Sequence, residues 1–139
     1  MREILFRGKC KATGNWVEGD IFRSQNQIFI VNEFAYEVIP ETVSEYTGIP
    51  DKNGKKIFEG DYWLDTDGDY LVYVVEFREG QFGFVCYGWQ GVLMPYGFDE
   101  NAGGFGEIDF SPMTDFNIDL IEIDGNIHDN PELLKGGAE

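Results

Sequence analysis

The strongest strand signal in the chain is Tyr70-Leu71-Val72-Tyr73-Val74-Val75-Glu76-Phe77. Side chains alternate between the two faces of a strand, so this stretch has one wholly apolar face and a second face on which only Glu76 is charged. Apolar residues on both faces are typical of a central strand, or of a strand in a small closed barrel. Glu79-Gly80 follows and predicts a two-residue turn into a second strand over residues 81–87.

Shorter strand signals precede this stretch, at residues 4–6, 16–22, 28–31, 37–39 and 42–47. The polar residues 24–27 predict a hairpin connection, and Pro40 predicts a break because it has no N–H to donate to a ladder. Residues 32–38 are also compatible with a helical turn. Residues 48–60 predict a connection that contains a tight turn at Asn53-Gly54.

The signals after the strongest strand are weaker. Residues 92–94 predict one more strand, whereas the Gly-rich and acidic residues 97–107 predict an exposed loop. The apolar alternation changes phase at Leu120-Ile121, which predicts a β-bulge because one extra residue reverses the facing of all that follow. Asn130-Pro131 predicts the start of a short helical turn that ends at Gly136-Gly137. The sequence therefore predicts a mainly β fold with one short C-terminal helical turn.

Composition indicates one folded domain, residues 1–139. Apolar residues make up 42% of the chain and aromatic residues 16%, which is too much for a disordered chain. No apolar run approaches the roughly 18 residues of a membrane span, and the N-terminus lacks the apolar segment of a signal peptide. Cys10 and Cys86 could form one bridge, but two reduced thiols are the simpler interpretation. These observations predict a cytoplasmic protein with no membrane partner.

The charge is distributed unevenly along the chain, whose formal net charge is −16. Residues 1–56 hold 8 acidic and 8 basic residues, whereas residues 57–139 hold 18 acidic residues and only Arg78 and Lys135 as bases. This change in charge is compatible with a subdivision of the domain near residue 57. Such an acidic part repels nucleic acid and anionic lipid, and favours a basic partner or cations.

One acidic stretch, Asp65-Thr66-Asp67-Gly68-Asp69, is a candidate cation site. An EF-hand loop needs its glycine at the sixth position, and here Gly68 occupies the fourth. Glu76 follows Asp65 by eleven residues but belongs to the predicted strand, which cannot wrap around an ion. We interpret the stretch as a solvated turn, with a Ca²⁺ site as the alternative.

The other reactive side chains do not form a catalytic set. His128 is the only histidine, which makes a zinc site improbable and predicts a surface residue near the chain end. Cys86 shares a strand face with two phenylalanines and reads as a packing thiol, whereas Cys10 lies in a polar stretch where exposure is plausible. Gly103-Gly104-Phe105-Gly106 lacks the lysine and hydroxyl residue of a phosphate loop. The sequence thus predicts no catalytic, metal or cofactor-binding residue, and no cofactor.

Three stretches carry more specific motifs. They are Arg2-Glu3-Ile4-Leu5-Phe6-Arg7 with Gly19-Asp20-Ile21; Val38-Ile39-Pro40-Glu41-Thr42-Val43, Tyr46-Thr47-Gly48-Ile49 and Asp51-Lys52-Asn53-Gly54-Lys55-Lys56-Ile57-Phe58-Glu59-Gly60-Asp61; and Ile121-Glu122-Ile123, Gly125-Asn126-Ile127 and Asn130-Pro131-Glu132-Leu133-Leu134. In these stretches the sequence resembles the YopX family of phage and prophage proteins. The resemblance implies a phage or prophage origin and a small SH3-like barrel or roll. It implies no activity and supplies no site residue.

Four functions are compatible with these observations. The first is a non-enzymatic accessory protein that binds other proteins or forms a homo-oligomer, with aromatic residues such as Trp89, Tyr96 and Phe98 as possible contacts. The second is an acidic mimic of nucleic acid that occupies a host nuclease or DNA-binding protein. The third is an enzyme that uses carboxylates or a cation. The fourth is nucleic-acid binding around Arg2, Arg7, Lys9 and Lys11, which the net negative charge of the chain opposes.

Overall fold

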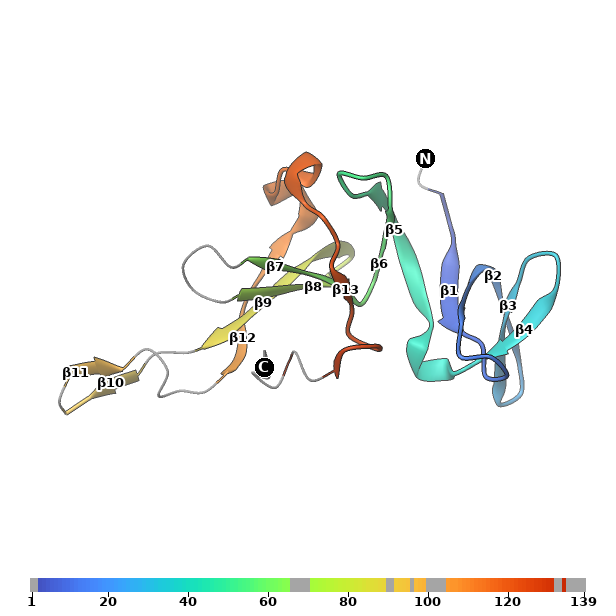
Figure 1. Cartoon of the computed structure of the whole chain (residues 1–139), viewed down its shortest axis with the longest axis horizontal. Coiled ribbons are helices and arrows are strands. Elements are labelled where there is room, and N and C mark those ends of the chain that lie inside the picture. Colours follow the sequence, from blue (N-terminus) through green and yellow to red (C-terminus); the bar gives the residue numbers. More distant parts are fainter. Residues whose placement is uncertain are drawn as a thin grey trace. The chain divides into compact units, whose positions relative to one another are not determined.

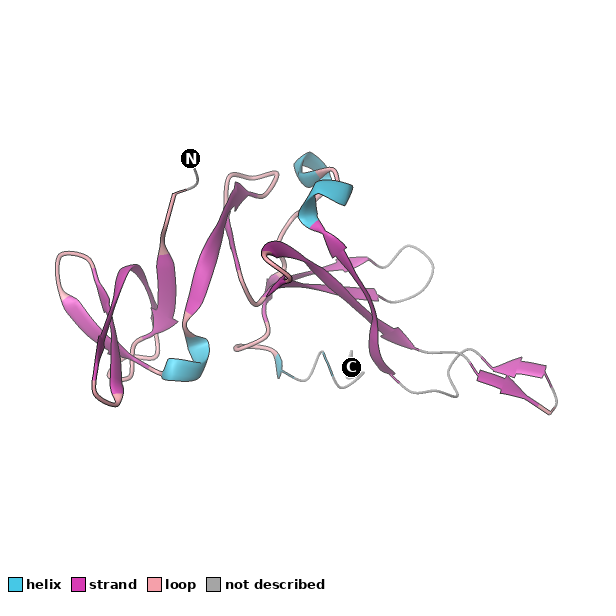
Figure 2. Ribbon diagram, turned by 180° about the vertical axis from the view of Figure 1, so that it is seen from behind, coloured by secondary structure: helices cyan, strands magenta, loops and turns pink. Residues whose placement is uncertain are grey.

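A computed structural model describes residues 3–65, 71–89, 92–95, 97–99, 105–131 and 134 (Figure 1). The chain forms two compact units. The N-terminal unit comprises Met1–Pro50 and Lys56–Glu59, and the C-terminal unit comprises Asp51–Lys55 and Gly60–Glu139. Antiparallel strands dominate both units, and the helical segments drawn in Figure 2 are short, so the predicted mainly β fold is confirmed.

The N-terminal unit contains one antiparallel sheet of six strands. The strands are β1 (Phe6–Lys9), β2 (Trp16–Ser24), β3 (Gln27–Val31), β4 (Ala35–Val38), β5 (Ser44–Pro50) and β6 (Lys56–Phe58), and their order in the sheet is β4-β3-β2-β1-β5-β6. A short 3₁₀ helix, η1 (Pro40–Thr42), separates β4 from β5. The predicted break at Pro40 is therefore confirmed.

This sheet curls so that its edge strand β4 returns to the chain just after β1. Val38 at the end of β4 forms an isolated bridge with Cys10, flanked by two backbone hydrogen bonds of 2.9 Å. The approach is close, because a Cβ atom on Gly8 would lie 3.0 Å from Val38. Ile30 and Val38 are fully buried. One bridge is not a ladder, so the described strands form no closed barrel and the expected SH3-like barrel is not confirmed.

The C-terminal unit contains a sheet of five strands and a separate hairpin. The five strands are β7 (Asp61–Asp65), β8 (Leu71–Arg78), β9 (Gln81–Trp89), β12 (Phe105–Pro112) and β13 (Gly125–Asn126), in the order β12-β9-β8-β7-β13. The hairpin joins β10 (Val92–Met94) and β11 (Gly97–Asp99). Two 3₁₀ helices, η2 (Met113–Asp115) and η3 (Ile118–Leu120), follow β12.

The strand that gave the strongest signal, β8, is the central strand of this sheet. One face carries stacked and edge-on aromatic rings, in which Phe116 from the segment after η2 packs against Trp63, Tyr73 and Phe84. The opposite face carries a cluster of buried side chains, Tyr62, Val72 and Val74, packed against Ile127 and Leu134 among others. Because both faces are covered, both must be apolar, as the sequence predicted.

The turn after β8 is also confirmed. Arg78 pairs with Gln81, so Glu79 and Gly80 form a two-residue loop between β8 and β9. Both residues have positive φ, 53° and 83°, which is the signature of a type I′ hairpin turn.

Several local predictions were wrong. The alternative of a helical turn at residues 32–38 fails because the Asn32 side chain accepts the N–H of Phe34 at 3.1 Å and turns the chain into β4. The bulge predicted at Leu120-Ile121 is instead the end of η3, where the Ile121 N–H donates to the Ile118 carbonyl at 3.0 Å. A register shift does occur, but in β12 between Glu107 and Asp109.

The predicted loop at residues 97–107 is wrong at both of its ends. Residues 97–99 form β11 and residues 105–107 begin β12, a strand that the sequence did not predict. The first strand was predicted at residues 4–6, but the observed strand, β1, begins at Phe6 and ends at Lys9. The predicted C-terminal helical turn is not confirmed, because most of it lies outside the described residues.

Candidate functional site

A groove in the C-terminal unit runs beside β7. It is lined by Trp63, Leu64 and Asp65 of β7 and by Leu120, Ile121, Glu122 and Asp124 of the segment after η3. Its volume is about 560 Å³, which lies within the range of roughly 300–1,000 Å³ that ligand sites occupy. Four lining residues are apolar and three are acidic, so the groove combines contact area with negative charge.

The groove exists because one side of β7 is only partly paired. β8 pairs with β7 from Tyr62 to Asp65, whereas β13 pairs only with Asp61 and Tyr62. Beyond that point the Asp124 side chain accepts the Leu64 N–H at 2.9 Å. A carboxylate therefore takes the place that a strand would otherwise fill at this edge.

The segment after η3, which forms the opposite wall of the groove, is anchored by Asp51. Asp51 is a buried carboxylate that the sequence analysis did not single out. Its side chain is 6% exposed and accepts the N–H groups of Asn53 at 2.9 Å, Lys55 at 3.0 Å and Ile123 at 3.0 Å. Burial alone would raise the pKa of Asp51, but these three donors and the Lys55 charge outweigh it and hold the pKa below its ordinary value. The spacing Asp51-x-Asn53-Gly54, typical of a side chain that closes its own turn, was the available signal.

Three groove residues, Leu120, Glu122 and Asp124, are exposed, and Asp124 is already hydrogen-bonded to Leu64. Leu120, the last residue of η3, is 75% exposed, which is unusual for so large an apolar side chain. Glu122 is exposed and forms a long ion pair, 3.5 Å from Lys52. Such surface pairs contribute little, about 0–1 kcal/mol, so Glu122 can exchange this partner for another cation at small cost.

The Trp63 side chain belongs to the aromatic cluster and also lines the groove. Its ring stacks on Tyr73 with centroids 4.1 Å apart and planes 8° from parallel. Its Nε1 atom is buried and has no hydrogen-bond acceptor among the described residues. A buried donor without a partner costs about 1–3 kcal/mol, so this N–H is a candidate for an acceptor that arrives with a ligand.

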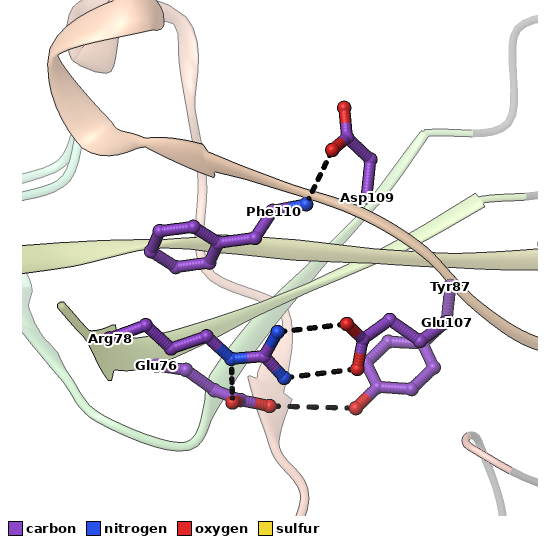
Figure 3. A network of polar contacts seen from close by, with 6 residues as sticks. All are labelled: Glu76, Arg78, Tyr87, Glu107, Asp109 and Phe110. Atoms are coloured by element: carbon purple, nitrogen blue, oxygen red, sulfur yellow. Dashed lines mark hydrogen bonds and ion pairs between the residues drawn. The ribbon is translucent and has the colours of Figure 1, made fainter.

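Outside the groove, a network of hydrogen bonds and ion pairs connects side chains on β8, β9 and β12 (Figure 3). The Arg78 guanidinium donates to both carboxylate oxygens of Glu107, at 2.8 and 2.9 Å, and to Glu76 at 2.9 Å. Tyr87 donates to the other Glu76 oxygen at 3.5 Å. The Arg78 hydrogen bonds lower the pKa of Glu107. The network lies on one face of the sheet, and its two glutamates neutralise the positive charge of Arg78.

The two cysteines occupy separate packing environments. Cys86 is partly buried, its pKa is raised chiefly by burial, and it shares a hydrogen bond with Tyr73, in keeping with a packing role. Cys10, for which the polar stretch made exposure plausible, is buried and forms the bridge to Val38. Hydrogen bonds involving Thr13 lower the Cys10 pKa.

His128, predicted to be a surface residue, is half-buried against Gly60. A Cβ atom on Gly60 would lie 3.2 Å from the His128 Nε2 atom, and the φ of Gly60 is +89°. Glycine is therefore required just before β7.

The described basic residues considered for nucleic-acid binding all contact groups of the chain itself. Arg7 is 7% exposed, and its guanidinium lies 4.6 and 4.7 Å from the ring centroids of Trp16 and Phe58. Lys9 lies over the same Trp16 ring, and Lys11 pairs with Glu37 at 3.0 Å. Arg2 lies outside the described residues.

Other predicted sites are only partly covered by the structure. Of the acidic stretch 65–69, Asp65 alone is described, and it lies in the groove wall. Gly103 and Gly104 lie outside the described residues, as do Tyr96 and the side chains of Trp89 and Phe98. Within the described ranges no cluster of three or more His, Cys, Asp or Glu side chains could hold a metal ion. In the same ranges no helix has the length and apolar character needed to cross a membrane.

The fold and the groove define a class of small, all-β protein with an acidic groove beside a partly paired strand. The model of the YopX protein family matches residues 5–135, nearly the whole chain. The chain therefore belongs to the YopX family, as the motifs suggested. A search of the curated proteins found no match.

Proposed function

We propose that this chain is a non-enzymatic accessory protein of a phage or prophage that acts in the host cytoplasm by binding a protein with a basic surface. The observation that carries the proposal is the excess of carboxylates in the C-terminal unit. That unit holds 18 acidic and 4 basic residues, a net charge of −14. An excess of this size attracts a cationic partner and speeds its association.

Two of the four bases of the C-terminal unit are already paired with carboxylates, which leaves the excess of acids without counter-charges. Arg78 is held by two glutamates, and Lys52 lies 3.5 Å from Glu122. The groove beside β7 adds exposed apolar area at Leu120 to the negative field. Protein interfaces typically combine an apolar contact with polar surroundings in this way.

The described reactive groups support binding better than catalysis. Cys10 is buried in one unit, and Cys86 is hydrogen-bonded to Tyr73 in the aromatic cluster of the other. His128 packs against Gly60. Each of these groups has a packing role that accounts for its position, so no nucleophile and base need be invoked.

Capture from host cells, followed by binding with purified components, tests the proposal. The full chain is used as bait after crosslinking in the host, and each recovered protein is purified and titrated against it by calorimetry. We expect a basic partner whose affinity falls at least about tenfold between low and high salt, and for which polyglutamate competes. Failure of every purified candidate to bind, with the chain monomeric by sedimentation, contradicts the proposal.

The same purified partner separates two forms of the proposal. If duplex DNA and the chain compete for one surface of the partner, the chain acts as a nucleic-acid mimic, which requires carboxylates spaced like the phosphates of a duplex, one charge per about 1.7 Å of axis. If sedimentation shows self-association and no other partner is found, the module is an oligomerising one.

A further inference from the structure

We propose that the groove beside β7 binds an extended segment of the partner protein in which arginine or lysine alternates with apolar residues. This inference rests on the function proposed above and names the surface and the recognised chemistry. It depends on three features of the groove: its position along a strand edge, its charge, and its exposed apolar rim.

The position favours an extended ligand. β13 ends its pairing at Tyr62, so the part of β7 that lines the groove, Trp63 to Asp65, has no strand partner on that side in the described part of the chain. A segment that runs along this edge presents alternate side chains to the groove and to solvent. Asp124 already accepts the Leu64 N–H, so we expect side-chain contacts rather than a full added strand to dominate binding.

The chemistry of the walls selects the side chains of that segment. Asp65 lies in the β7 wall and Glu122 in the opposite wall, so basic side chains can reach a carboxylate on either side. Arginine fits better than lysine, because its planar guanidinium can bond one carboxylate with two N–H groups. Leu120, 75% exposed at the rim, offers apolar contact to the intervening residues.

The Trp63 Nε1 atom provides a further point of contact. It is buried and has no acceptor among the described residues, although its ring lines the groove. A backbone carbonyl of the bound segment is the natural acceptor for this N–H, and reaching it requires a small adjustment of the wall.

A second copy of the chain fits this groove less well than a different protein. The chain carries a formal net charge of −16, so two copies repel each other. Three of its described cations are also already engaged: Arg7 by two aromatic rings, Lys11 by Glu37, and Arg78 by two glutamates. The groove therefore calls for cations that another protein supplies.

Titration with a short peptide in which arginine alternates with valine tests this inference directly. Calorimetry with the full chain compares the wild type with the groove variant Asp65→Asn/Glu122→Gln and with a matched variant, Glu79→Gln/Asp115→Asn. Both variants remove two charges, but Glu79 and Asp115 are exposed residues that do not line the groove. We expect the groove variant to bind at least about tenfold more weakly and the matched variant to change less than about twofold.

One further protein variant and one control peptide test whether the groove itself binds the arginine–valine peptide. Leu120→Ser alters an exposed side chain and should leave folding intact, yet weaken the same peptide several-fold. A peptide with glutamine in place of arginine should not bind measurably. Equal weakening by the groove and matched variants, or an unaffected Leu120→Ser variant, overturns the groove as the binding surface.

The outcome is separable from that of the proposed function. If a purified partner binds the wild type and the groove variant equally, the groove inference fails and the protein-binding function stands. If the chain binds neither the peptide nor any purified basic partner, both fail.

Discussion

The two units share an antiparallel design but use charge in different ways. The N-terminal unit holds 8 acidic and 6 basic residues, whereas the C-terminal unit holds 18 and 4. In the N-terminal unit, Arg7 is buried between two aromatic rings. In the C-terminal unit, Arg78 lies at the surface between two glutamates. The N-terminal unit is therefore nearly neutral, with a net charge of −2, whereas the C-terminal unit has a net charge of −14 that can attract a cationic partner.

The largest expected effect tests the aromatic cluster of the C-terminal unit. Phe84 is 1% exposed and meets Trp63 and Phe116 edge-on. Phe84→Ala should lower the free energy of unfolding by about 3–5 kcal/mol, because it removes a buried ring and leaves a cavity. Urea denaturation followed by tryptophan fluorescence measures the loss. A loss near zero would show that the cluster is not packed as described.

The next effect concerns Asp51, whose carboxylate ties the turn at residues 51–55 to the groove wall. Asp51→Asn should cost about 1.5–3 kcal/mol, since hydrogen bonds to a charged group are stronger than neutral ones and the amide must turn a donor toward a backbone N–H. Asp115→Asn, a change at an exposed carboxylate, should cost less than about 0.5 kcal/mol.

The Asp51 contribution should also depend on pH in a defined direction. Its pKa is lowered in the folded protein, so its stabilisation is complete above the unfolded value of about 3.9 and is lost as pH falls through the folded pKa. The wild type should therefore be more stable than Asp51→Asn at neutral pH, and the difference should shrink in acid. A difference that stays constant down to strongly acidic pH would show that the charge of Asp51 contributes nothing.

A smaller effect is expected at Arg7. Arg7→Lys keeps the charge but loses the planar contact with Trp16 and Phe58, which should cost about 1–2 kcal/mol. Added salt should leave this loss nearly unchanged, because the interaction is buried. Denaturation at low and high salt makes the measurement, and a loss that disappears in salt would contradict the packing role.

The smallest effect is expected at Arg78, the counterpart of Arg7 in the C-terminal unit. Arg78→Lys loses the paired hydrogen bonds to Glu107, but the Arg78 and Glu107 side chains are 34% and 44% exposed, so the loss of stability should be smaller than the loss at Arg7. High salt should reduce it further. An Arg78 loss larger and less salt-sensitive than the Arg7 loss would reverse the comparison between the units.

Sequence patterns predicted the features that arise from strong local signals. β8 was predicted from apolar residues on both faces, and the turn at Glu79-Gly80 from its place between two strands. β12 was missed because it is partly exposed and interrupted by a register shift at residues 107–109, so its alternation is not regular. The phase change at Leu120-Ile121 was real, but a 3₁₀ turn produces it as well as a bulge does.

The groove itself could not be predicted from the sequence. Its walls come from residues 63–65 and 120–124, which meet only because β13 pairs with β7 and because Asp51 binds the N–H of Ile123. Both are long-range contacts, which no local pattern encodes. The acidic composition predicted the sign of the charge but not where apolar surface would accompany it.

The central claim is that the C-terminal unit, and not the N-terminal unit, is the docking surface for basic partners. Amide and indole resonances of the labelled full chain, followed during titration with the arginine–valine peptide, test it residue by residue. We expect saturable shifts at Leu64, Ile121, Glu122 and the Trp63 indole, with the β1–β4 resonances unmoved. Shifts concentrated in β1–β4, or scattered over exposed acids of both units, would contradict the account.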